Sequence, residues 1–483
     1  MKEGSKSRRE FVAGLSGLVL TVKGGSLIAE VSGKASPDTA GRVILRGNSE
    51  YESQRSSSVW QAIKPMRYPD LIVQAESIAD VVSTIRFARE QEMKIAVRGS
   101  GHNYVASYLR DGGILLDVSR LRDVEIDPSA RVARVQPGIR GAEFAYRLES
   151  HQLCFPVAHV ATVPLGGYLL GGGMGWNGEQ WGQFACFNVR AVDVVTAAGE
   201  QLTVSEDFHP DLYWAARGAG PAFCAVATRF HLDVFPLPRA IIASTFVYSI
   251  DALDAVTEWL EAAAHDPKIE LTLILETDTP AEDAVSEPNR LCIVSAICFA
   301  DEPRDARNLL RALAEGAPTK DRVAFDALKP TTFAKVLAAS RSGTPRRVAV
   351  DTAWVKLRRE ALLAFGAHFK KAPSRHAILI ANYRTIAQLP TSAACSVVAR
   401  IFLNVFNGWD AAGDDAVNLR WMDEAVEIFD PFTVGSYINE TDFVRRPGRA
   451  RQCYSTESWG RLQAVTKQYD PDGMFSPLFE LAG

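Results

Sequence analysis

Arg98-Gly99-Ser100-Gly101-His102-Asn103-Tyr104 forms a glycine-rich loop directly after the apolar run Lys94-Ile95-Ala96-Val97. A second glycine cluster occupies residues 166–176. Glycines after a strand let the backbone adopt positive φ and turn its N–H groups toward an anionic ligand. Arg98 is then placed to add charge-assisted hydrogen bonds to phosphate, and His102 to face the ligand. The alternative is two unrelated glycine turns and a histidine that caps one of them.

Length and composition narrow the class of protein. A chain of 483 residues is too long for a single core, so two packed domains are expected. The net charge of −4 gives no general basic field, which argues against a nucleic-acid partner. No apolar stretch long enough to span a membrane follows the N-terminus. The seven cysteines are scattered without a C-x-x-C pair, so we expect buried apolar residues and no metal centre.

The N-terminal segment, residues 1–35, has the features of an export signal. Arg8-Arg9 precedes a mostly apolar run over residues 12–22, and small residues lead to Ala35. This resembles a twin-arginine signal, which would place the mature protein in the periplasm or outside the cell. The alternative is a charged tail that runs into a short helix of a cytoplasmic protein.

Residue patterns predict alternating strands and helices. Leu71-Ile72-Val73 reads as a strand, Ser77 as the cap of a helix, and residues 94–97 as the next strand. Pro236 and Pro238 mark a domain boundary. We expect a cofactor-binding domain over 36–238, a substrate domain over 239–430, and a closing segment over 431–483. Further expected elements lie at 113–117, 131–135, 140–149, 191–196, 225–232, 269–275, 291–299, 377–380, 416–429 and 457–469.

A nucleotide-binding fingerprint occurs at Gly173-Met174-Gly175-Trp176-Asn177-Gly178, with Asp193 at the spacing of a ribose-binding acid. Its context is wrong for that fold. Prolines and glycines interrupt the residues before it, and Gly178 and Gly182 disfavour the helix that should follow. We therefore do not expect a Rossmann site here.

The order of these motifs resembles the berberine bridge enzyme-like FAD-linked oxidases of the vanillyl-alcohol oxidase/p-cresol methylhydroxylase superfamily. The resemblance covers about residues 51–237 and 435–475. It rests on six ordered blocks: 97–104, 162–176, 193–199, 212–226, Tyr437-Ile438-Asn439 and Tyr469-Asp470-Pro471. It implies an α+β fold, with a two-part FAD-binding domain and an α/β substrate domain built on an antiparallel sheet.

The resemblance also implies the cofactor and its contacts. The histidine that matches His102 is bonded to the flavin 8α-methyl carbon in such proteins, and the matching loops enclose the cofactor. Bicovalent members carry a cysteine where this chain has Val160, so a single attachment is expected. The implied FAD-binding residues are Arg98, Gly99, Ser100, Gly101, His102, Asn103, Thr162, Val163, Gly166, Gly167, Gly172, Gly173, Gly175, Val226, Tyr437 and Asn439.

Two departures from the family pattern bear on the chemistry. Ala222 and Cys224 replace an asparagine and a glycine of a flavin-lining block, which puts a cofactor contact in doubt. Many members have Tyr-x-Asn-Tyr with the second tyrosine as base, whereas this chain has Tyr437-Ile438-Asn439-Glu440. A carboxylate in an apolar cleft can have its pKa raised and serve as a base. Glu440 is therefore the first candidate base and Tyr437 the second, unless Glu440 is a surface partner of Arg445 or Arg446.

The expected reaction is oxidation of a small organic molecule at a C–H bond next to O–H or N–H. Val163 matches a position where valine is associated with oxygen access, which favours molecular oxygen as acceptor. A dehydrogenase with another acceptor and a catalytically silent FAD-binding protein remain alternatives. His159, His209 and His231 have no metal-ligand spacing and read as structural or exposed. Trp176 and Trp181 either line the flavin or pack the loop, and packing is favoured. Pocket-lining and core roles are equally open for Trp354, Tyr383 and Phe406.

Overall fold

The computed structural model describes residues 36–263, 265–278, 289–339, 346–356, 358–385, 388–475 and 477–481. It also traces the backbone of an antiparallel pair, β1 (Leu18–Lys23) and β2 (Ser26–Val31). Arg8 and Arg9 lie outside the described residues. Among the described residues, no helix is both long enough and apolar enough to cross a membrane.

A four-stranded sheet carries the glycine-rich loop. Its order is β3 (Arg42–Leu45), β4 (Leu71–Gln74), β6 (Ile114–Asp117) and β5 (Ile95–Arg98). The expected strand–helix–strand unit is confirmed, because α2 (Ile78–Glu90) connects β4 to β5. Ser77 begins α2 with a capping box in which its hydroxyl accepts from the Asp80 N–H at 3.1 Å. Strand β5 ends at Arg98 and so delivers the loop at the sheet edge.

A five-stranded antiparallel sheet packs beside it in the same N-terminal region. Helices α3 (Gly141–Glu149) and α5 (Pro210–Ala215) contribute to its core, as does the short α4 (Leu165–Leu170), which lies where a loop was expected. The strand order is β11 (Gln201–Ser205), β10 (Val189–Thr196), β12 (Ala225–Asp233), β8 (Val132–Val135) and β7 (Val124–Asp127).

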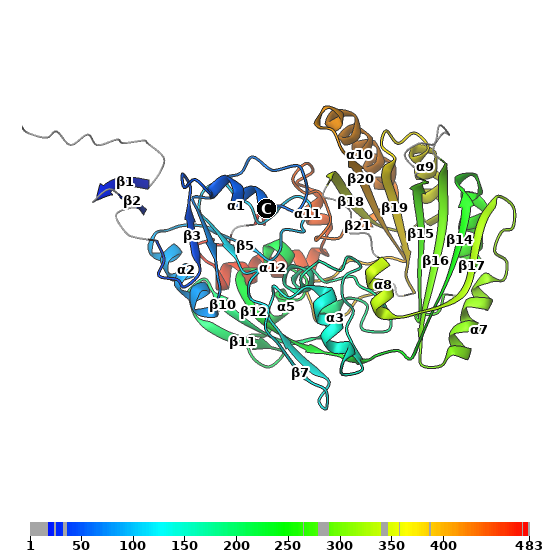
Figure 1. Cartoon of the computed structure of the whole chain (residues 1–483), viewed down its shortest axis with the longest axis horizontal. Helices are drawn as coiled ribbons and strands as arrows, with labels where there is room; N and C mark the ends of the chain where they lie inside the picture. Colours follow the sequence, from blue (N-terminus) through cyan, green and yellow to red (C-terminus); the bar gives the residue numbers. More distant parts are fainter. Residues whose placement is uncertain are drawn as a thin grey trace, which may run out of the picture.

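The central region is built on an eight-stranded sheet. Its order is β17 (Arg322–Thr331), β14 (Ala240–Ser249), β16 (Arg290–Ala300), β15 (Ile269–Thr277), β19 (His376–Tyr383), β20 (Ile401–Trp409), β18 (Arg347–Val355) and β21 (Thr433–Gly435). Side chains alternate across each strand. On β15, Leu271, Leu273 and Leu275 join a buried core with four helices: α6 (Leu253–Ala262), α7 (Pro303–Ala314), α9 (Arg358–Phe369) and α10 (Asp415–Phe429). The opposite face is turned toward the N-terminal region (Figure 1).

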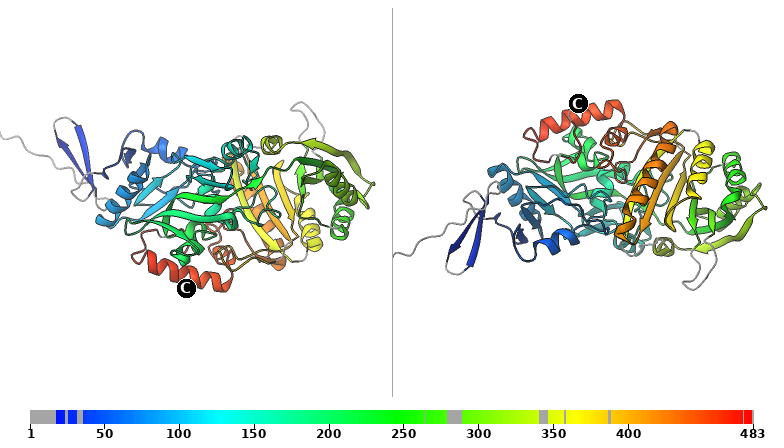
Figure 2. Two further views of the ribbon diagram at one scale, coloured as in Figure 1. Left: turned by 90° about the horizontal axis from the view of Figure 1, so that it is seen from below. Right: turned by 90° about the horizontal axis from the view of Figure 1, so that it is seen from above.

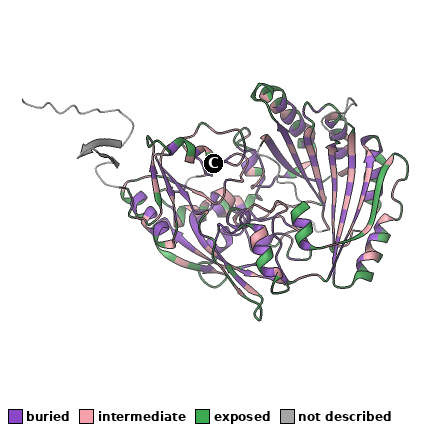
Figure 3. Cartoon of the chain, viewed as in Figure 1, coloured by how far each residue is buried: buried purple, intermediate pink, exposed green. Residues whose placement is uncertain are grey.

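The last part of the chain connects the two regions. Strand β21 pairs with β18 in the central sheet, after which α11 (Arg449–Gln452) and α12 (Thr456–Tyr469) follow. Helix α12 lies beside the N-terminal region in every view (Figures 1 and 2), and its Leu462 and Val465 join that region's core. Buried residues continue through both regions and the junction between them (Figure 3). The mixed α+β class and the antiparallel central sheet agree with expectation.

Candidate active site

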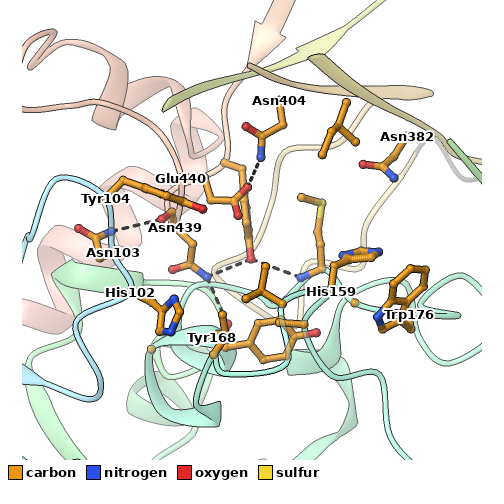
Figure 4. Close-up of a pocket in the computed structure, with 18 of the residues that line it drawn as sticks. His102, Asn103, Tyr104, His159, Tyr168, Trp176, Asn382, Asn404, Asn439 and Glu440 are labelled. Carbon is orange, nitrogen blue, oxygen red and sulfur yellow. Dashed lines mark hydrogen bonds between the residues drawn. The ribbon is translucent and has the colours of Figure 1, made fainter. Parts of the chain in front are cut away.

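A cavity of about 1290 Å³ lies between the two glycine segments and the central sheet (Figure 4). Its volume exceeds the roughly 300–1,000 Å³ that is typical of a site for one small ligand, so there is room for a cofactor and a substrate together. Twelve of the sequence-predicted residues line it: Gly99, Ser100, Gly101, His102, Asn103, Val163, Gly166, Gly167, Gly175, Tyr437, Asn439 and Glu440.

The remaining predicted residues lie behind the cavity wall. Arg98 was expected to bind phosphate, but its guanidinium donates to Asp117 at 2.7 Å, to the Ser58 carbonyl at 2.9 Å and to the Ser100 carbonyl at 2.8 Å. The arginine therefore shapes the loop from inside the protein. Val226 is fully buried in the core beneath the loop. Thr162, Gly172 and Gly173 contact residues that line the cavity.

Two glycines have opposite roles in forming the cavity. Gly101 has φ +84°, and a Cβ there would lie 2.0 Å from the Ser58 carbonyl oxygen, so no other residue fits this packed turn. Gly167 lines the cavity, and a Cβ built on it would meet no described heavy atom within 4 Å outside its own helix. Its backbone is thus open to a ligand, which fits the close approach of a flat cofactor.

His102 is held in one orientation in the cavity wall. Its Nε2 lies 3.1 Å from the Thr162 hydroxyl, and its ring stacks on Trp60 with 5.5 Å between centroids. Burial, and next the positive charges of Arg140 and Arg98, lower the pKa of His102 to about 4. The imidazole is therefore neutral near pH 7. With Nε2 engaged by Thr162, Nδ1 is the ring nitrogen left to react.

Tyr437 anchors the second glycine segment. Its hydroxyl oxygen accepts from the backbone N–H groups of Gly173 at 3.1 Å and Met174 at 3.3 Å, and from Asn439 Nδ2 at 2.9 Å. The side chain is buried, and this burial raises the pKa of Tyr437 well above its usual value. The phenol therefore stays protonated near neutral pH, which disfavours it as the base.

Glu440 points into the cavity from the turn that follows Tyr437 (Figure 4). Its Oε2 accepts a hydrogen bond from Asn404 Nδ2 at 2.5 Å. Burial raises the pKa of Glu440 to about 7, although the nearby charge of His159 and the Asn404 bond act in the opposite direction. Arg445 and Arg446 bind Asp423 and Asp351 instead. The surface ion-pair interpretation of Glu440 is therefore wrong.

His159 was missed as a cavity residue, and Trp176, for which packing was favoured over a place beside the flavin, lines the cavity as well. His159 Nε2 lies 2.5 Å from Glu270 Oε1, and its ring lies 4.4 Å from that of Trp176. Glu270 also accepts from the Asn177 N–H at 2.8 Å. The sequence signal that could have placed Glu270 on the cavity face is the alternation of side chains along β15, which turns Glu270 away from the helices. This alternation does not identify His159 as its partner. Trp181 does pack as expected, against Phe235.

The other residues left open by the sequence divide between cavity and core. Phe406 lines the cavity, whereas Tyr383 is buried in the core on the other face of the sheet, where its ring stacks on His265 with 5.5 Å between centroids. Trp354 is buried against Phe402 with 4.7 Å between ring centroids. His231 binds Asp193 at 3.1 Å, and Asp193 is thus engaged within the sheet. All seven cysteines are free and buried, and Cys224 lies in the core with Ala222.

These observations fit a flavin cofactor. Open glycine backbone, a neutral histidine and a buried carboxylate line one cavity, which is large enough for a dinucleotide and a second molecule. Backbone N–H groups in such glycine turns bind phosphate oxygens without a side-chain cation. The position of Arg98 away from the cavity is therefore compatible with FAD.

Comparison with known proteins identifies the cofactor class. Residues 69–205 match the model of a FAD binding domain. The chain is 29% identical to FAD-linked oxidoreductase janO of Penicillium janthinellum, over 89% of this chain and 96% of that one. It is 30% identical to (R)-6-hydroxynicotine oxidase of Paenarthrobacter nicotinovorans, over 43% of this chain and 44% of that one.

A solved structure has the same fold. The BBE-like 1 protein of Physcomitrella patens superposes with a TM-score of 0.78, at 17% identity, over 92% of this chain and 98% of that one. The FAD-binding match, the near full-length relative and this shared fold agree with the motif order along the chain. The chain is therefore an FAD-linked oxidoreductase with a FAD-binding domain, and it shares the fold of the BBE-like 1 protein.

Proposed function

We propose that this oxidoreductase is an oxidase that holds FAD by a single covalent bond from His102. The observation that carries the proposal is the presence, in one cavity, of a neutral oriented imidazole and a carboxyl group whose pKa is about 7. Such a carboxylate is matched to proton removal near neutral pH. The position of Val160, which lines the cavity where a second attachment would need a thiol, supports a single bond.

The residues divide the reaction between them. A substrate with a C–H bond next to O–H or N–H lies against Glu440, which takes the O–H or N–H proton as the C–H hydride departs and a C=O or C=N bond forms. Asn404 holds the carboxylate in place, and Tyr437 holds the glycine turn beneath it. Bound between the glycine segments and His102, FAD would supply the acceptor for this hydride, and O₂ would reoxidise it to give hydrogen peroxide.

The covalent bond is tested by His102→Ala. Acid precipitation of the native protein should leave yellow flavin on the polypeptide, whereas the variant should release all of its flavin into the supernatant, because no other residue replaces the Nδ1 bond. His209→Ala is the control, since this histidine is exposed and lies beside Tyr469. Flavin fluorescence of the denatured polypeptide is the measurement. Free flavin from the native protein would contradict the covalent attachment.

Oxygen as acceptor is tested by Val163→Leu. Val163 lines the cavity, and an additional methylene there should obstruct the approach of O₂. We expect reoxidation of the reduced enzyme to slow about tenfold, which corresponds to about 1.4 kcal/mol in the barrier, with flavin reduction by substrate unchanged. Stopped-flow mixing of reduced enzyme with oxygen measures this, and Val163→Ala is the control. Slow reoxidation of the native enzyme without peroxide would instead establish a dehydrogenase.

We also propose that residues 1–35 direct export by the twin-arginine route. The support is the Arg8-Arg9 pair before an apolar segment. Lys substitution of both arginines should retain the protein in the cytoplasm with its FAD loaded. Cell fractionation followed by flavin fluorescence measures this. Equal distribution of native and variant protein would contradict the signal.

A further inference from the structure

The cavity face of the central sheet is divided into rows that run across the strands. Strand pairing places Ile293 opposite Ile274, Ile274 opposite Ile380, and Ile380 opposite Asn404. All four residues line the cavity. Neighbouring strands lie about 4.8 Å apart, so this row extends for about 14 Å from Ile293 to Asn404. The row is apolar along its length and polar at one end.

A second row runs parallel to it. Thr245, Ser295, Thr272 and Asn382 are successive cross-strand neighbours and also line the cavity. The amide of Asn382 is already engaged, because its Nδ2 donates to the Thr272 hydroxyl at 3.0 Å. This row therefore offers small hydroxyl groups beside the isoleucines and no charged group.

The polar end of the isoleucine row has acceptors that need donors. The ionised carboxylate of Glu440 only accepts hydrogen bonds, so Asn404 presents Nδ2 to it and keeps Oδ1 for another partner. Asn404 is only 4% exposed, and its Oδ1 has no hydrogen-bond partner among the described residues. A buried amide oxygen without a partner costs free energy that a bound donor would recover. Glu440 supplies the second acceptor beside it.

We propose that the substrate is an extended apolar molecule whose reacting end carries an O–H or N–H donor, and not a sugar. The apolar skeleton lies along Ile293, Ile274 and Ile380, and the donor binds Asn404 Oδ1 and Glu440. A sugar carries hydroxyl groups around its ring. The second row could bind those on one edge, but the hydroxyl groups that lie against the isoleucines would lose their hydrogen bonds to water. The assignment of the reacting end rests on the proposed oxidase function, whereas the apolar body rests on the sheet alone.

The test measures ligand binding to the oxidised holoenzyme, and the change in flavin absorbance on binding is the readout. 4-(1-Adamantyl)phenol combines a rigid apolar body with one donor, and it has no hydrogen on the carbon bearing O–H or on the benzylic carbon, so it cannot give up a hydride there. 1-Phenyladamantane lacks the donor, and D-glucose lacks the apolar body. We expect the phenol to bind about tenfold or more tightly than the hydrocarbon, and glucose to give no saturable change.

Ile380→Asn should weaken binding of the phenol about tenfold, whereas the matched Ile380→Val should weaken it only about threefold. The ligand comparison on the native enzyme needs neither variant and stands if Ile380→Asn fails to fold. Tighter binding of glucose, or equal binding of the phenol and the hydrocarbon, would overturn the proposal. The probe is bound without being oxidised, so its affinity does not depend on catalysis. If no substrate were turned over, the proposed oxidase function would be contradicted, but the binding result would still stand.

Discussion

Glu440→Gln is expected to slow flavin reduction by substrate about 10²- to 10⁴-fold, the usual contribution of a positioned base, while the flavin stays attached. Glutamine keeps the shape and can still contact Asn404, which lies 2.5 Å from the native carboxylate, but it cannot take the substrate proton. Anaerobic stopped-flow bleaching of the flavin measures the rate. Unchanged reduction would remove Glu440 from the mechanism.

The pH dependence of the native enzyme provides a second readout of the same residue. Because the pKa of Glu440 is raised to about 7 and the ionised form is the base, flavin reduction should accelerate as pH rises through 7 and then level off. This increase in rate with pH, the acid limb of the profile, should be absent in Glu440→Gln. Tyr437→Phe is the comparison, since its phenol has a pKa far above this range. If the limb persisted in Glu440→Gln and vanished in Tyr437→Phe, the base would be the tyrosine.

Asp351→Ala should have the largest effect on stability, a loss of about 3–5 kcal/mol in the free energy of unfolding. Asp351 lies on β18, is 2% exposed, and binds Arg446 at 3.0 Å and Arg449 at 3.1 Å. Arg449 also donates to the Thr352 carbonyl at 2.7 Å and to Ser436 at 3.0 Å. Removal of the carboxylate leaves arginine charge in the interior and loosens the segment that carries Glu440.

Asp423→Ala is the matched control for this prediction. Asp423 binds the same Arg446, but its side chain is 44% exposed, so its loss should cost less than about 1 kcal/mol. Denaturant unfolding of both variants measures the difference, and flavin absorbance reports whether the site survives in the folded protein. Equal losses in the two variants would contradict the importance of burial at Asp351.

Local chemistry explains what the sequence could reveal. The Ser77 cap, the strand that ends at Arg98 and the positive φ of Gly101 depend on neighbouring residues, so they could be predicted. The role of Arg98 could not, because its partner Asp117 arrives through the parallel pairing of β5 with β6. The role of His159 likewise depends on Glu270, which comes from β15 of the central sheet.

The cavity face of the central sheet could not be predicted from the sequence for the same reason, because it too depends on contacts between distant strands. Alternation along β15 indicates which side chains share a face, but it does not indicate which residue of the next strand lies opposite. The row from Ile293 to Asn404 exists only through the register of four strands. Glu440 was accessible to sequence reasoning because it occupies a motif position, whereas its hydrogen bond to Asn404 depends on tertiary structure.

The order of the chain has a consequence for biosynthesis. His102 and the glycine segments leave the ribosome early, whereas Tyr437 and Glu440 lie among the last residues to be made. Strand β21, which pairs with β18 in the central sheet, ends at Gly435, shortly before Tyr437, whose hydroxyl engages the Gly173 turn. Domains of a growing chain fold in order from the N-terminus. A nascent or truncated polypeptide can therefore contain His102 and both glycine segments while it still lacks Tyr437, which holds the second segment, and Glu440, which would start the reaction.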